Sequence, residues 1–126
     1  MRYLLASLIT LFFVACGASG TPSWTVMPPS DGKVYGVGSS PIHVKGLTFQ
    51  RALAISRAID EIARQKGVTV SNTLERVESV TSAGHASSAA QSYSVQSVDG
   101  QKVNAKIKEV YRDPRSNKIF VLMVAN

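Results

Sequence analysis

The sequence is poor in the side chains that bind metals or form crosslinks. Its 126 residues include one cysteine, Cys16, and two histidines, His43 and His85. A single cysteine excludes an intramolecular disulfide and a zinc site built from cysteines. The histidines are far apart in the chain and belong to no HExxH motif and to no cluster with Asp or Glu. We therefore expect no metal site and no cofactor.

Catalytic motifs are also missing. There is no Gly-x-Ser-x-Gly elbow and no phosphate-binding loop. Gly36 and Gly38 match the first two glycines of a dinucleotide-binding fingerprint, but Pro41 stands where the third glycine is required. Asp60 and Glu61 fall on the predicted solvent face of a helix, where ion pairing is the expected role of carboxylates. We expect no catalytic residue and no enzymatic activity.

The charge is basic but dispersed. Fourteen Lys and Arg residues against eight Asp and Glu residues give a formal net charge of +6. No run of five like charges occurs, which argues against a nucleic-acid-binding tail. A mildly basic domain is compatible with a solvated surface, with contact to anionic lipid head groups or with an acidic protein partner.

Residues 1–15 have the pattern of a signal peptide. Arg2 precedes an apolar stretch over residues 3–14. As a helix this stretch would span about 18 Å, whereas the hydrocarbon core of a bilayer is about 30 Å thick. A retained transmembrane helix is therefore disfavoured.

The end of this stretch, Val14-Ala15-Cys16, resembles the bacterial lipobox, in which the cysteine becomes the acylated first residue of the mature chain. Phe13 departs from that pattern, which prefers Leu at this position. The resemblance implies lipidation, including palmitate, on Cys16, and Gly17 in place of Asp implies the outer membrane. The alternative is an ordinary cleaved signal peptide with an incidental Cys16. We divide the chain into a signal peptide (1–15), a lipidated tether (16–23) and a single domain (24–126).

The clearest predicted element of the domain is a helix over residues 48–66, with Thr48 as its N-cap and Gly67 following its end. Ion pairs Arg57–Glu61 and Asp60–Arg64 are expected on its outer face. Its buried face is formed by residues at spacings of three and four, namely Phe49, Ala52, Ile55, Ile59, Ile62 and Ala63. Further alanines on this helix would let a sheet approach closely.

Four strands are predicted, over residues 33–38, 68–74, 101–108 and 118–125. The glycines of the first permit a close backbone approach, and the last is apolar throughout, as in a central strand buried on both faces. Residues 81–94 are small, polar and uncharged and are predicted to form a loop. We expect Trp24 to pack on the domain edge, or else to sit in the lipid head-group zone. The result is an α+β domain of order β-α-β-β-β, with one amphipathic helix on a mainly antiparallel sheet.

A family resemblance spans about residues 24–125. It rests on Trp24 with Pro28-Pro29, on Val34-Tyr35-Gly36-Val37-Gly38, on the alanine-rich helix, on Val68-Thr69-Val70, and on Val110-Tyr111 followed by Ile119-Phe120-Val121-Leu122. These features resemble the twenty-kilodalton outer-membrane lipoprotein family, which includes FlgP-type flagellar lipoproteins.

The resemblance implies a lipid-anchored protein of the cell outer membrane with its domain in the periplasm. It implies a homo-oligomer with a structural role in the cell envelope, supporting the flagellar basal body and motility through contacts with basal-body or other envelope proteins. Only Cys16 carries over as a functional residue. The alternative is a periplasmic or surface lipoprotein that binds a ligand or protein, with the basic residues and the segment 81–94 as its binding surface. No nucleic-acid partner is expected.

Overall fold

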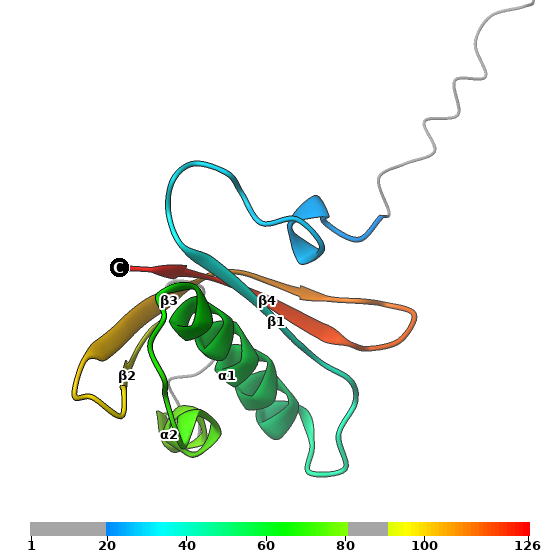
Figure 1. Ribbon diagram of the computed structural model, residues 1–126. Helices are drawn as coiled ribbons and strands as arrows, with labels where there is room; N and C mark the ends of the chain where they lie inside the picture. Colours follow the sequence, from blue (N-terminus) through cyan, green and yellow to red (C-terminus); the bar gives the residue numbers. More distant parts are fainter. Residues whose placement is uncertain (1–19, 81–90) are drawn as a thin grey trace, which may run out of the picture.

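The computed structural model describes residues 20–80 and 91–126 (Figure 1). Within these ranges the chain forms an antiparallel sheet of four strands, β1 (Tyr35–Ser40), β2 (Ser92–Gln96), β3 (Lys102–Arg112) and β4 (Ile119–Ala125), in the order β1-β4-β3-β2. Helices α1 (Leu47–Gln65) and α2 (Thr73–Val80) lie on one side of the sheet, and the short helix η1 (Ser23–Thr25) lies on the other. The predicted α+β class is confirmed. The predicted signal peptide (1–15) and Cys16 lie outside the described residues.

Strand β4 is a central strand, as its continuous apolar sequence predicted. It pairs with β1 on one side and with β3 on the other. Val121 and Met123 point into the core beneath α1, while Leu122 and Val124 pack on the opposite face beside Trp24. Both faces of β4 are covered, which explains why its sequence does not alternate.

Strand β3 alternates as predicted. Val103, Ala105 and Ile107 are buried toward α1, and the side chains between them are exposed. A bulge at Lys108 shifts the register between Ile107 and Glu109. Beyond this extra residue β3 continues to pair with β4 as far as Arg112.

Helix α1 packs unusually close to β1. A Cβ atom built on Gly38 would lie 1.9 Å from the carbonyl oxygen of Ala54, and one built on Gly36 would lie 2.1 Å from that of Ala58. No side chain fits at either glycine, and the two alanines keep the helix surface low at the same points. The glycine pair that partly matched a dinucleotide fingerprint is therefore a helix-packing surface.

Three polar side chains of α1 complete the hydrogen bonding of β1, which is an edge strand. Gln65 Nε2 donates to the Tyr35 carbonyl at 2.7 Å, and Arg57 Nη1 donates to the Ser39 carbonyl at 2.7 Å. The buried Gln50 donates from Nε2 to the carbonyls of Ser40 and Asn117 at 3.1 and 2.8 Å. These donors hold α1 against the edge strand, and Gln50 also ties that strand to the residue Asn117 before β4.

The ends and outer face of α1 differ in part from the prediction. Gly67 follows the helix with φ +70° as expected. The N-cap is Gly46, not Thr48, because the positive φ of Gly46 turns the chain into the helix earlier. The predicted ion pairs are wrong. Arg64 pairs with Glu61, three residues before it, because Arg57 is bound to β1 and Asp60 to α2.

The prediction of a strand over residues 68–74 is wrong. Val70 forms only an isolated bridge to Ser97, and α2 begins at Thr73. The apolar Val77 is fully buried against the core and Leu74 packs beside it, a helical spacing of three. The predicted loop 81–94 is also too long, since Ser92, Tyr93 and Ser94 belong to β2. Residues 81–90 lie outside the described part of the chain.

We expect Gly38→Ala to destabilise the domain by about 3 kcal/mol or more, because the added methyl group meets helix backbone and not a movable side chain. The check is the urea unfolding midpoint followed by circular dichroism. Gly20→Ala is the matched control, because a Cβ there meets nothing within 4 Å. Equal midpoints for the two variants would contradict the close packing of α1 on β1.

Candidate functional site

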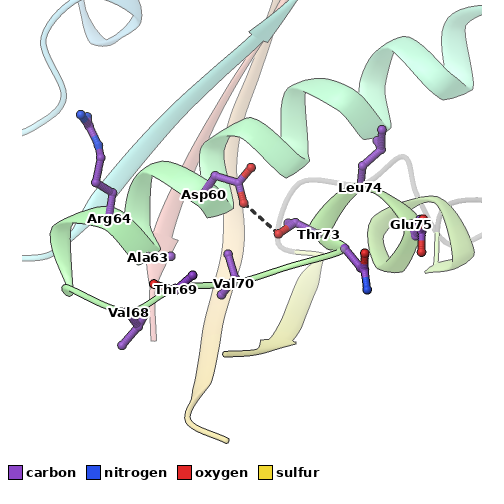
Figure 2. A pocket seen from close by; sticks show the side chains of 10 residues that line it. Asp60, Ala63, Arg64, Val68, Thr69, Val70, Thr73, Leu74 and Glu75 are labelled. Carbon is purple, nitrogen blue, oxygen red and sulfur yellow. Dashed lines mark hydrogen bonds between the residues drawn. The ribbon is translucent and has the colours of Figure 1, made fainter. Parts of the chain in front are cut away.

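A cavity of about 530 Å³ lies where the end of α1 meets the beginning of α2 (Figure 2). Its walls come from the last turns of α1, the connecting segment and the first turn of α2. The lining residues are Asp60, Ala63, Arg64, Val68, Thr69, Val70, Asn72, Thr73, Leu74 and Glu75.

The local backbone explains why a hollow forms here. The N–H groups of Gly67 and Val68 donate to the carbonyls of Arg64 and Ala63, which is the bonding of a Schellman motif. The chain then runs outward and is held to the β2–β3 connection by the bond from Val98 N–H to the Thr69 carbonyl at 2.8 Å. Asn72, with φ 58°, reverses its direction into α2. The connecting segment therefore bows away from α1.

One hydrogen bond closes the inner end of the cavity. The hydroxyl of Thr73, a residue only 5% exposed, donates to Asp60 Oδ1 at 2.8 Å. Figure 2 shows this bond between the two helices, with the Arg64 side chain directed away from it. The lining thus includes two carboxylates, Asp60 and Glu75, and the apolar side chains of Val68, Val70 and Leu74. Such a lining suits a small ligand with hydrogen-bond donors.

A second polar cluster lies on the opposite face of the sheet. The Tyr35 hydroxyl donates to Asp31 Oδ2 at 2.6 Å, and Lys108 Nζ lies 3.3 Å from that hydroxyl and 5.1 Å from the ring centre. The Tyr35 hydroxyl and the Lys33 backbone N–H lower the pKa of the Asp31 carboxyl. The cluster ties the segment that follows η1 to strands β1 and β3.

The residues that the sequence analysis considered as possible sites make ordinary packing and hydrogen-bond contacts, as far as they lie in the described part of the chain. His43 packs against Phe49 with ring centres 4.3 Å apart, and its Nδ1 accepts from the Lys45 N–H. Asp60 and Glu61 bind different partners, Thr73 and Arg64. Cys16, the predicted lipidation site, and His85 lie outside the described residues. Over residues 20–80 and 91–126, no group of three potential metal ligands comes together.

Neither helix in the described part of the chain has the length and apolar character needed to cross a bilayer. No family model, no curated protein and no solved structure matches this chain.

Sequence reasoning did not find the cavity, because it read residues 68–74 as a strand. Three signals pointed the other way. The alternation of residues 68–74 slips by one after Glu75, and Leu74 and Val77 have helical spacing. Asn72 is a residue type that tolerates positive φ and so commonly marks a reversal.

The lowered pKa of Asp31 gives a pH dependence with a definite sign. Its stabilising effect is full above the ordinary value of 3.8 and is lost as pH falls through the lower value of the folded state. We expect Asp31→Asn to be less stable than the wild type near neutral pH and the gap to close in acid. Thermal unfolding across the acidic range measures this, with Asp99→Asn as a control at an exposed turn. A gap that is constant with pH would contradict the assignment.

Proposed function

We propose that this protein is a lipoprotein of the outer membrane, anchored through acylated Cys16, whose α+β domain serves a structural or assembly role in the cell envelope. The observation that carries the proposal is Val14-Ala15-Cys16 directly after an apolar stretch of signal-peptide length. Two or more acyl chains give stable membrane attachment without a membrane-spanning helix.

The geometry of the amino-terminal arm supports anchoring close to the membrane. Trp24 is buried on the sheet beside Tyr35, Leu122 and Val124, which confirms its predicted place on the domain. The Thr25 hydroxyl donates to the Pro22 carbonyl at 2.7 Å and tightens η1. Helix η1 begins at Ser23, seven positions after Cys16, so only a short stretch of chain joins the proposed anchor to the sheet.

The specific role that we propose is support of the flagellar basal body, as a homo-oligomer in contact with basal-body proteins. Its basis is the resemblance over residues 24–125 to the family that includes FlgP-type lipoproteins. A second candidate is a ligand-binding or protein-binding lipoprotein unrelated to flagella, and the cavity between α1 and α2 is the feature that favours it.

The anchor predicts a clear biochemical result. In wild-type cells the mature amino-terminal peptide should begin at acylated Cys16, and the protein should sediment with the outer membrane. In Cys16→Ser the added mass of the acyl chains should be absent, and the protein should no longer sediment with the outer membrane. Mass spectrometry and density-gradient fractionation measure both, with Ser19→Ala as the matched control. An unacylated wild-type chain that begins elsewhere would refute the anchor.

The flagellar role predicts that deletion of the gene reduces swimming and removes a feature at the outer-membrane end of the motor. Soft-agar motility and cryo-electron tomography of wild-type and deletion cells test it, with the wild-type gene restored as the control. Unchanged motors and normal swimming would exclude the flagellar role and leave the binding-module candidate.

A further inference from the structure

The face of the sheet opposite α1 is only partly covered in the described structure. Trp24 covers its β1–β4 half, where Tyr35, Leu122 and Val124 are buried. On the β2–β3 half the side chains that point the same way are exposed. They are Ser92, Ser94 and Gln96 of β2 and Lys102, Asn104, Lys106 and Lys108 of β3. We call this half the basic face.

The basic face carries a net positive charge. Three lysines, Lys102, Lys106 and Lys108, stand on one strand within about 20 Å, given the rise of about 3.3 Å per residue. Neither β2 nor the part of β3 that pairs with it, Lys102–Lys106, carries an acidic residue. Two carboxylates lie next to the lysines. Glu109 follows the bulge and, as the partner of Leu122, belongs to the same face of the sheet, and Asp31 accepts from the Tyr35 hydroxyl. The other half adds Lys118, whose ammonium lies 5.1 Å from the centre of the Phe120 ring.

The chain that leads to the anchor leaves from this same side. Helix η1 lies across the sheet from α1 (Figure 1). Just after it, Val26 and Met27 are 89% and 72% exposed, although both are large apolar residues. Gly20 lies four positions after Cys16, so a fully extended chain between them spans at most about 14 Å. A lipid on Cys16 would hold this side of the domain, and not the side of α1, near the bilayer.

We propose that the basic face binds a membrane surface through its anionic lipid head groups, with Val26 and Met27 immersed at the edge of the contact. The inference rests on the proposed anchor at Cys16, which brings the face to the membrane. The lysines are attracted to anionic lipid, and each raises the membrane-binding constant by a factor of about five near such a surface. Exposed apolar side chains next to them enter the boundary between head groups and acyl chains. Helix α2 and the cavity then face away from the membrane.

The first test compares lysine accessibility on two membranes. The acylated protein is reconstituted into vesicles of phosphatidylcholine or of phosphatidylethanolamine with phosphatidylglycerol, and amines are labelled with a water-soluble reagent. On anionic vesicles, labelling of Lys102 and Lys106 should slow about fivefold relative to neutral vesicles. Lys66, at the end of α1, should be labelled equally on both. High salt should remove the difference, because it screens exposed charges.

The second test uses variants that remove equal charge from opposite sides. Trp24 is the sole tryptophan and lies on the membrane-facing half, so quenching of its fluorescence by brominated lipid reports the contact. K102Q/K106Q should lose the extra quenching that anionic lipid produces. K66Q/R76Q, at two exposed sites on the helical side, should keep it. Lys108 is left unchanged because it contacts Tyr35.

The outcomes separate this inference from the proposed function. Acylated protein whose Lys102, Lys106 and Lys66 are labelled alike on both vesicles would overturn the lipid contact and leave the anchor standing. If the protein isolated from wild-type cells is unacylated and its lysines are still protected on anionic vesicles, the anchor alone is overturned. If that unacylated native protein does not bind anionic vesicles, both the anchor and the lipid contact are overturned. Protection in isolated envelopes but not on vesicles would assign the face to an acidic protein instead.

Discussion

The direct contact between the backbones of α1 and β1 sets the geometry of the whole domain. Gly36 and Gly38 offer no side chain, and Ala54 and Ala58 offer only methyl groups, so helix carbonyls rest on the strand. At this short separation Gln50, Arg57 and Gln65 reach the carbonyls along β1. A helix held farther out by larger side chains would leave these groups without a donor. It would also open the core that Ile55, Ile59 and Ile62 fill. The close packing of α1 on β1 is therefore also what protects the edge of β1.

The two sides of the sheet have different characters because only one carries long helices. On the helical side, burial is nearly complete and the polar groups are tied by specific bonds, as between Asp60 and Thr73. On the other side a short helix with one large aromatic residue, Trp24, covers part of the surface. Strand β2 and the part of β3 before its bulge alternate, so their outward side chains form a polar and basic layer. The chain that enters the domain crosses this second side, and this gives the two faces different neighbours in any anchored protein.

Much of the fold was predictable from periodicity. Helix α1 and strands β3 and β4 each bury a complete apolar pattern, and their positions agree with expectation to within a few residues at most ends. The failures come from segments whose local preference is overridden by packing. Val68-Thr69-Val70 has strand-forming side chains, yet only Val70 finds a partner, because α2 fills the space where a strand would extend. The predicted ion pairs of α1 did not form because Arg57 bonds to β1 and Asp60 to α2. Residue spacing within α1 gives no information on contacts with other elements. The cavity depends on how the connecting segment bows, which is decided by tertiary contacts.

The order of strands in the sheet has a consequence for how the domain forms. Strand β1 has no neighbour until β4 arrives, since Tyr35 pairs with Val124 and both helices, β2 and β3 lie between them in the chain. Helix α1 and β1 can meet early, because they are adjacent in sequence. At that stage the edge of β1 that will pair with β4 has no partner, because β4 lies far along the chain. Bringing two strands together that are so far apart in the chain loses conformational entropy before the stabilising contacts between them form, and this slows folding. We therefore expect the pairing of β1 with β4 to form late, after the consecutive strands β2, β3 and β4 have paired.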